Sequence, residues 1–210
     1  MKLWHIDSSV LGENSASRKL TAALVAREDA AHPGLAIEYL DLAANPVGHL
    51  SPAHIGAMFG HPPTDAATLA DIARGQSFID TLMGADIIVI GVPMYNFGLP
   101  TQLKAWADRV LVAGKTFKYG ADGVPFGLVP AGKKVYLAST RGGLYGPGSP
   151  AAGLEHQESH LIAMLNFIGL TDITIHHADG LAIPGLKDPA IAAALGEIAA
   201  PARAEPATIA

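Results

Sequence analysis

The sequence predicts an α/β protein with a doubly wound parallel sheet of five strands, flanked by helices. Short apolar runs rich in β-branched residues alternate five times with longer helical patterns. The runs are continuously apolar, as in Ile87–Val92, which is typical of parallel strands buried on both faces. The 210 residues are 50% hydrophobic and only 16% charged, so one large core can be filled. We therefore expect a single domain over residues 1–210.

A strand is expected wherever β-branched and apolar residues run together between turn residues. These runs are Lys2–Ile6, Ala36–Leu40, Ile87–Val92, Lys134–Ala138 and Asp172–His176. Helices are expected where apolar residues recur every three or four positions. Those segments are Ser17–Glu28, a segment from Thr64 or Asp65 to Met83, Thr101–Val112, His156–Ile168 and Pro189–Ala200. The expected inward side chains of the first two helices are Leu20, Leu24 and Val25, then Leu69, Ile72, Ile79 and Leu82.

Composition excludes several classes of protein. The formal net charge of −5 argues against nucleic-acid binding, which needs clustered Lys and Arg. The absence of cysteine excludes disulfide scaffolds, thiolate zinc sites and cysteine-held iron–sulfur clusters. No apolar stretch approaches the ~20 residues that a membrane-spanning helix needs, and His5 and Asp7 interrupt any secretory signal at the start. We therefore expect a soluble cytoplasmic protein with no membrane or nucleic-acid partner.

The predicted sheet also predicts where a ligand binds. In open α/β sheets, ligands bind outside the carboxyl ends of the strands, where the strand order reverses. Three segments that follow predicted strands have unusual compositions: Asp7–Ser17, Pro93–Pro100 and Ser139–Gly148. We expect the binding site where these three loops meet.

The first loop is rich in hydroxyl groups and leads directly into a helix. A helix N-terminus binds phosphate readily, and Ser9, Ser15 and Ser17 could add hydrogen bonds. Arg18 is near enough to add positive charge. Simple N-capping by Ser15 or Ser17 is the alternative. The loop contains neither G-x-G-x-x-G nor G-x-x-x-x-G-K-[ST], so it indicates a mononucleotide site rather than a dinucleotide or triphosphatase site.

The second loop places Met94, Tyr95 and Phe97 between two prolines. A thioether and flat rings on a stiff loop are groups against which a planar heterocycle would pack. The same side chains could instead simply cover the end of the sheet.

Several motifs, taken in their order along the chain, resemble one known family. They are Met94–Phe97 with Thr101–Lys104, then Trp106–Arg109, Thr116–Tyr119, Gly127–Leu128, Arg141–Tyr145 and Asn166–Leu170, together with the spacing of Ser9, Ser15 and Ser17. From Lys2 to about Ala182 the chain resembles the FMN-dependent NADH:quinone oxidoreductases known as azoreductases. The resemblance implies a flavodoxin-like fold and a homodimer, with one FMN per subunit held partly by the partner chain at the interface.

The resemblance also implies which residues form the site. The FMN phosphate would lie against Ser9, Ser15, Ala16 and Ser17. The isoalloxazine ring would lie between two loops formed by Pro93, Met94, Tyr95, Asn96 and Phe97 and by Ser139, Thr140, Arg141, Gly142 and Gly143. Glycines suit such a loop because a residue without Cβ lets the backbone approach a flat ligand closely. Tyr119 and Phe167 are candidates for aromatic walls of the substrate slot, with core packing as the alternative.

The activity implied is a ping-pong cycle in which NADH or NADPH reduces FMN and a quinone or azo compound then takes two electrons. The alternative is a flavodoxin-type electron carrier that binds FMN but has no organic substrate.

Sequence motifs of two other enzyme classes, zinc proteases and serine hydrolases, are absent. His156 and His160 have helical spacing, but the residues around them match no zinc-protease motif, and we expect no metal. No G-x-S-x-G occurs, which argues against a serine hydrolase.

Overall fold

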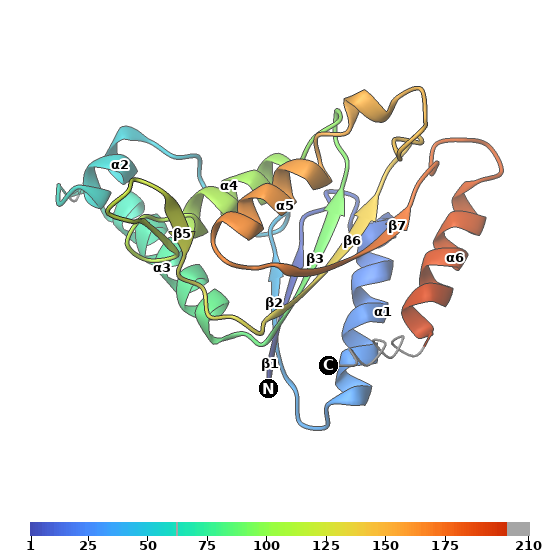
Figure 1. The fold of residues 1–210 in the computed structure, drawn as a ribbon, viewed down its shortest axis with the longest axis horizontal. Helices are drawn as coiled ribbons and strands as arrows, with labels where there is room; N and C mark the ends of the chain where they lie inside the picture. Colours follow the sequence, from blue (N-terminus) through green and yellow to red (C-terminus); the bar gives the residue numbers. More distant parts are fainter. Residues whose placement is uncertain (62, 201–210) are drawn as a thin grey trace.

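Five parallel strands form one sheet in the order β2-β1-β3-β6-β7 (Figure 1). The structure is a computed structural model that describes residues 1–61 and 63–200. The strands are β1 (Lys2–Asp7), β2 (Ala36–Asp41), β3 (Ile87–Pro93), β6 (Lys134–Thr140) and β7 (Asp172–Ala178). All neighbouring pairs are parallel. The chain runs outward from β1 to β2 and then crosses to β3 on the other side of β1, so the strand order reverses between β1 and β3.

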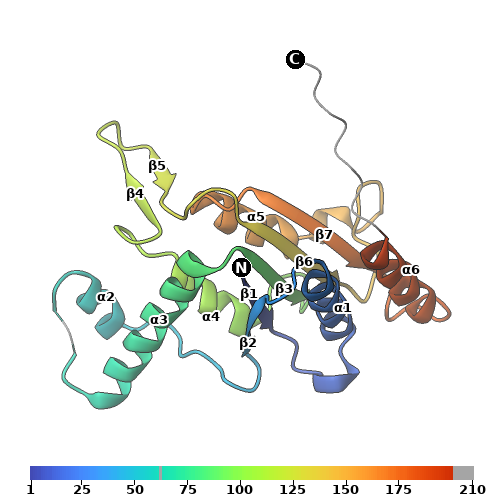
Figure 2. The ribbon, with the colours of Figure 1, turned by 90° about the horizontal axis from the view of Figure 1, so that it is seen from below.

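Helices cover both faces of the sheet, as Figures 1 and 2 show. On one face, α1 (Ala16–Ala31) and α6 (Lys187–Ala199) pack against each other and against the strands. The other face is covered by α3 (Ala66–Gly84), α4 (Thr101–Val110) and α5 (Glu158–Phe167). This arrangement is the doubly wound fold that the sequence predicts.

Every residue of the central strand β3 is buried, because helices pack on both of its faces. Ile88, Ile90 and Val92 belong to the core beneath α3, α4 and α5. Ile87 and Val89 belong to the core beneath α1 and α6. Successive side chains of a strand point to opposite faces, so this position requires a continuously apolar run. The prediction of strands buried on both faces is confirmed for β3.

All five predicted strands and all five predicted helices are present, with ends that shift by a few residues. Asp65, one of the two predicted caps, begins α3: its carboxylate accepts a hydrogen bond of 2.8 Å from the N–H of Thr68. The prediction that Leu69 faces inward is wrong, since this side chain is 42% exposed. The buried residues of α3 begin only at Gly75, so its first turns lie outside the core.

Besides two 3-10 turns, at Gly12–Asn14 and Ala152–Leu154, three short elements lie where the sequence predicts only loops. They are α2 (Pro52–Met58) and a hairpin of β4 (Phe117–Tyr119) and β5 (Pro125–Gly127). Elements this short show no clear hydrophobic period, so the pattern of apolar residues does not reveal them. The helix α2 begins with a capping box between Ser51 and His54, and β4 pairs with β5. Both α2 and the hairpin lie on the side of the molecule away from α6 (Figures 1 and 2).

The fourth predicted helix begins later than expected. His156 precedes α5, which starts at Glu158, so His156 and His160 do not share a helical face. Within residues 1–61 and 63–200, no three His, Cys, Asp or Glu side chains gather as metal ligands. Across the same ranges, no helix is both long and apolar enough to cross a membrane.

Gly127, at the end of β5, determines how the hairpin docks on the rest of the molecule. A Cβ at this position would overlap the carbonyl group of Ile168 and the nitrogen of Gly169, which are backbone atoms. We predict that Gly127→Ala lowers the free energy of unfolding by about 3 kcal/mol, near the upper range for overpacking. Urea denaturation measures this change. Gly196→Ala in α6 is the control and should be stabilising by about 0.5–1 kcal/mol, because a Cβ at Gly196 meets nothing within 4 Å. Unchanged stability of Gly127→Ala would contradict the docking.

Candidate active site

Three loops meet at the carboxyl edge of the sheet, where the strand order reverses. The hydroxyl of Tyr95, after β3, lies 3.2 Å from Ser9 Oγ and accepts a hydrogen bond of 3.1 Å from the N–H of Val10, both after β1. The N–H of Met94 donates to the carbonyl of Thr140, at the end of β6, at 2.8 Å. The structure therefore brings together the three segments that the sequence singles out.

The hydroxyl-rich loop ends in a capped helix. Ser15 Oγ accepts a hydrogen bond of 3.3 Å from the N–H of Arg18 and lies 3.0 Å from Ser17 Oγ, so Ser15 is the N-cap of α1. Capping does not use the N–H groups of Ala16 and Ser17, which have no acceptor within the helix because they belong to its first turn. Both serines and Ala16 are buried at this point. The helix start is thus a small cradle of N–H and hydroxyl donors of the kind that binds an anion.

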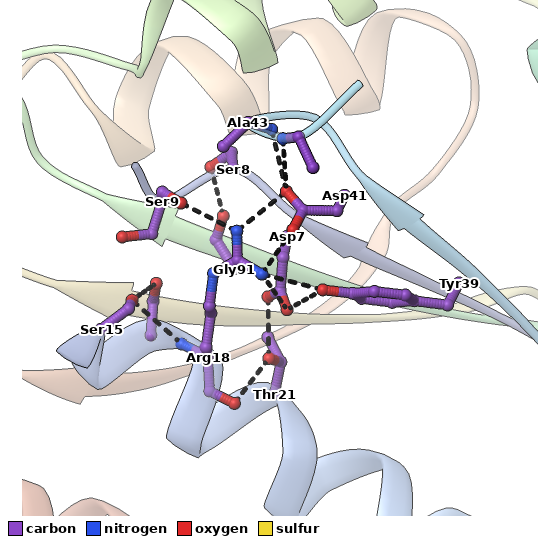
Figure 3. Close-up of polar contacts among 12 residues, drawn as sticks. Asp7, Ser8, Ser9, Ser15, Arg18, Thr21, Tyr39, Asp41, Ala43 and Gly91 are labelled. Atoms are coloured by element: carbon purple, nitrogen blue, oxygen red, sulfur yellow. Dashed lines mark hydrogen bonds and ion pairs between the residues drawn. The ribbon is translucent and has the colours of Figure 1, made fainter. Parts of the chain in front are cut away.

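Arg18 does not offer a free positive charge to this cradle, contrary to the sequence-based expectation. Its guanidinium donates two hydrogen bonds to the carboxylate of Asp41, at 2.7 and 2.8 Å, and one to the carbonyl of Ser9 at 2.9 Å (Figure 3). The hydrogen bonds from Arg18 lower the pKa of Asp41 below its usual range, and the same pairing raises the pKa of Arg18. Arg18 therefore holds the backbone of the loop while Asp41 neutralises its charge.

Asp7, at the end of β1, connects three elements beneath the loop. Its buried carboxylate accepts hydrogen bonds from the hydroxyls of Thr21 in α1, at 2.9 Å, and Tyr39 in β2, at 3.1 Å (Figure 3). Burial, and then the negative charge of Asp7, raise the pKa of Tyr39 to about 12, so this hydroxyl stays protonated and donates. A Cβ on Gly91 of β3 would lie 2.7 Å from Asp7 Oδ1, so any other residue here would require this buried, hydrogen-bonded carboxylate to move.

The aromatic loop after β3 is a strained two-residue turn. Tyr95 and Gly98 exchange two backbone hydrogen bonds of 3.1 Å each. Between them, Asn96 (φ 47°) and Phe97 (φ 71°) are both left-handed. This conformation costs roughly 1–2 kcal/mol for a residue with a Cβ, and such strain persists only where the surroundings enforce it. The loop thereby presents the ring of Phe97, which is 42% exposed, at the edge of the sheet.

The third loop has a buried foundation and an open tip. Ser139, Thr140 and the side chain of Arg141 are buried, whereas Gly142 is exposed and Gly143 half-buried. Arg141 turns beneath the loop, where Nε donates to the side-chain oxygen of Gln157 at 3.0 Å. The polar side chains that line the cavity of about 570 Å³ beside it are Arg141, Tyr145, Glu155, Glu158, His177 and Asp179.

The carboxylates around Arg141 form a mutually balanced cluster. Burial raises the pKa of Asp179. Burial also opposes ionisation of Glu158, but the hydrogen bond from His177 and the charge of Arg141 outweigh it and lower the pKa of Glu158. The hydrogen bond to Glu158 raises the pKa of His177 in turn. Arg141 therefore serves as the buried cation of this cluster.

The two candidate aromatic walls lie around the hairpin. Tyr119 is 61% exposed on β4. Phe167, at the end of α5, is half-buried with its ring 4.6 Å from that of Phe117. Phe117 also contacts Tyr119 edge to face at 5.8 Å, so both candidates pack about one ring.

Comparison with known proteins identifies the family. Residues 1–201 match the family model described as the flavodoxin-like fold. An FMN-dependent NADH:quinone oxidoreductase of Xanthomonas campestris pv. campestris is 52% identical over 200 residues, covering 94% of this chain and 98% of that protein. The chain belongs to the FMN-dependent NADH:quinone oxidoreductase family. Another FMN-dependent NADH:quinone oxidoreductase, from Bradyrhizobium sp., is 47% identical over 92% of this chain and 96% of its own length.

Solved structures agree with this assignment. The crystal structure of an azoreductase from Bacillus anthracis superposes with a TM-score of 0.84 at 28% identity, covering 94% of this chain and 96% of that one. The sequence-based prediction of the FMN-dependent NADH:quinone oxidoreductase family and its flavodoxin-like fold is therefore confirmed. Sequence reasoning missed Asp41 and Gln157, because no local pattern marks a residue that acts on a loop distant in the chain.

The Arg18–Asp41 pair makes stability depend on pH. The pKa of Asp41 is lower in the folded state than in the unfolded chain. The ionised carboxylate therefore contributes its full stabilisation of the fold above about pH 4, the ordinary carboxyl range, and this stabilisation is lost as the pH falls through the lowered pKa. We predict that Asp41→Asn lowers the free energy of unfolding by about 1–2 kcal/mol at pH 7, and that the difference from wild type shrinks below about pH 4. Urea titrations across this range measure it. The control, Asp80→Asn, alters an exposed carboxylate hydrogen-bonded to Gln76 and should change stability by under about 0.5 kcal/mol. A pH-independent Asp41→Asn difference would contradict the role of this pair.

Proposed function

We propose that the chain binds FMN at this carboxyl edge, as a single domain over residues 1–210, and uses NADH to reduce quinones and azo compounds. The observation that carries the proposal is the meeting of a hydroxyl-rich helix start with a strained aromatic loop, joined by the contact between Ser9 and Tyr95. The first offers donors to a phosphate and the second offers rings to a flat heterocycle. The relatives are named for FMN, NADH and quinone, and the Bacillus anthracis protein for azo reduction.

The phosphate of FMN would lie at the start of α1. Ser9, Ser15 and Ser17 would contribute hydroxyl groups, and the first-turn N–H groups of Ala16 and Ser17 would donate directly. The positive charge of Arg18 is already neutralised by Asp41, so the phosphate would be held by N–H and hydroxyl donors and the helix dipole. The role of Arg18 would be to keep the loop in place through the carbonyl of Ser9.

The flavin ring would lie between the loops after β3 and β6. One loop contributes Pro93, Met94, Tyr95, Asn96 and Phe97, and the other contributes Ser139, Thr140, Arg141, Gly142 and Gly143. When bound, FMN supplies the two-electron chemistry, accepting electrons from a nicotinamide and passing them to the acceptor. The chain's own part is to bind and orient the ring, and the two glycines permit close approach of backbone N–H groups. NADPH is the other candidate reductant, and the proposed compartment is the cytoplasm.

Assembly into a homodimer would complete the site. Large apolar side chains are exposed on the side away from α6, namely Ile55, Met58 and Phe59 near α2 and Tyr119, Val124 and Phe126 on the hairpin. Phe59 is 77% exposed, an unusual degree for a phenylalanine, which favours an interaction surface. Tyr119 would then line the substrate slot, with Phe167 contributed across the interface.

The decisive experiment is NADH oxidation by the purified protein. We expect a yellow protein containing FMN that oxidises NADH with a quinone and, separately, an azo dye as acceptor. Failure to take up added FMN would overturn the proposal. FMN binding without reaction toward NADH would favour the one-electron carrier instead.

Ser17→Ala should weaken FMN binding by about 1–2 kcal/mol in a fluorescence titration. Ser159→Ala, which removes an exposed hydroxyl from the first turn of α5, is the matched control and should leave binding unchanged.

The dimer has its own prediction. Phe59→Asp should convert the protein from dimer to monomer in sedimentation velocity, because a charge would be buried in an apolar interface. Leu186→Asp alters an exposed apolar residue next to α6 and should leave the dimer intact. A wild-type monomer at micromolar concentration would contradict the proposed assembly.

A further inference from the structure

We propose that Gln157 is a positioning residue that holds the two flavin-facing loops at a set separation. The effect of Gln157 on FMN binding rests on the proposed function, whereas the coupling of the two loops by Gln157 does not. Gln157 lies immediately before α5 and is completely buried. Nothing in the local sequence gives it a role.

The side-chain amide of Gln157 bridges the ends of two strands. Its Nε2 donates to the carbonyl of Val92 in β3, and its Oε1 accepts from Nε of Arg141 at 3.0 Å, just beyond β6. A carbonyl oxygen only accepts and a guanidinium only donates, so the orientation of the amide is determined by its two partners. The rigid, planar amide thus joins Val92, just before the aromatic loop (Pro93–Pro100), to Arg141, in the glycine loop (Ser139–Gly148).

This bridge lies at the carboxyl end of the pairing between β3 and β6, where Val92 is the second-last paired residue of β3. The pairing between β3 and β6 ends at Pro93 and Thr140, with one further backbone bond from Met94 to Thr140. Beyond that point the loops separate to form the two sides of the proposed slot. Gln157 adds a side-chain cross-link to these backbone bonds at the base of the loops, and a slot for a flat ring depends on a constant width.

Glutamine is the side chain that this position requires. It supplies one donor and one acceptor at the same distance from the backbone. An ionised glutamate lacks the donor, a methionine lacks both groups, and an asparagine is shorter by one methylene group. Because Gln157 is completely buried, water does not replace a hydrogen-bond partner that a substitution removes.

The residues beside Gln157 also contact the two loops. The N–H of His156 donates to the carbonyl of Phe97 at 3.0 Å, so the chain before α5 also holds the strained turn. The carboxylate of Glu155 accepts hydrogen bonds of 2.7 Å from the N–H groups of Gln157 and Glu158, which caps α5. Glu158 in turn lies 2.5 Å from Nη2 of Arg141. The segment Glu155–Glu158 therefore contacts both loops, and Gln157 is the member that joins them.

Amide hydrogen exchange of the protein without cofactor tests the structural part. Gln157→Met should accelerate exchange about tenfold in both residues 94–98 and 141–143, because each loop loses a buried hydrogen bond. Gln157→Glu, measured at pH 8, retains the acceptor for Arg141 and lacks the donor for Val92, so its acceleration should be confined to residues 94–98. No acceleration in either loop, or identical behaviour of the two variants, would overturn the proposal.

Lys133→Met is the matched control for general destabilisation. Lys133 is also buried at the end of a strand, and its ammonium donates to the carbonyls of Met83 (2.7 Å) and Ala85, but at the amino end of β6. This variant should leave exchange in residues 94–98 and 141–143 no faster than in the rest of the sheet. Preferential acceleration of those two loops by Lys133→Met would mean that they report global stability, and the proposal would fail.

The flavin provides a second readout. Gln157→Met should weaken FMN binding about tenfold and shift the flavin absorption bands, whereas Lys133→Met should do neither. FMN binding and a spectrum identical to those of wild type would overturn the positioning role. A wild-type protein that does not bind FMN would overturn the proposed function instead, and the exchange experiment would still decide whether Gln157 couples the loops.

Discussion

The burial of β3 on both faces is the constraint on which the rest of the structure depends. A strand with no exposed residue requires helices on each side, and the chain can supply them only by crossing the sheet in opposite directions from β1. That reversal brings the loops after β1 and β3 to the carboxyl edge of the sheet, where Tyr95 contacts Ser9. The site is thus a consequence of how the core is covered, and its walls are loops with a rigid base.

Charge at this edge is balanced within the protein. Arg18 is paired with Asp41, and Arg141 is surrounded by Glu155, Glu158 and Asp179. Buried charges need such partners because burial disfavours ionisation. The groups left for a ligand are therefore hydroxyls, backbone N–H groups, a thioether and aromatic rings. They match a cofactor that carries one phosphate and a flat, largely uncharged ring system.

Strain is concentrated in the loop that would contact this ring. Asn96 and Phe97 adopt left-handed conformations that most side chains avoid. The paired hydrogen bonds between Tyr95 and Gly98, and the bond from His156 to Phe97, maintain them. The same short segment before α5 contacts Arg141 through Gln157, so the strained turn and the glycine loop share one support.

The sequence by itself determined the five strands, their parallel arrangement, the three loops at the carboxyl edge and the family. These features depend on hydrophobic period and on contiguous motifs, which are properties of neighbouring residues. Only the tertiary structure decided that Arg18 is neutralised by Asp41, that the side chain of Arg141 lies beneath its loop, and that Gln157 links β3 to β6. It also decided that α2 and the β4–β5 hairpin form in segments that read as loops. The physical reason for the three side-chain contacts is that each joins residues distant in the chain, and local propensity does not specify such a partner. The helix α2 and the hairpin are local, but they are too short to show a hydrophobic period.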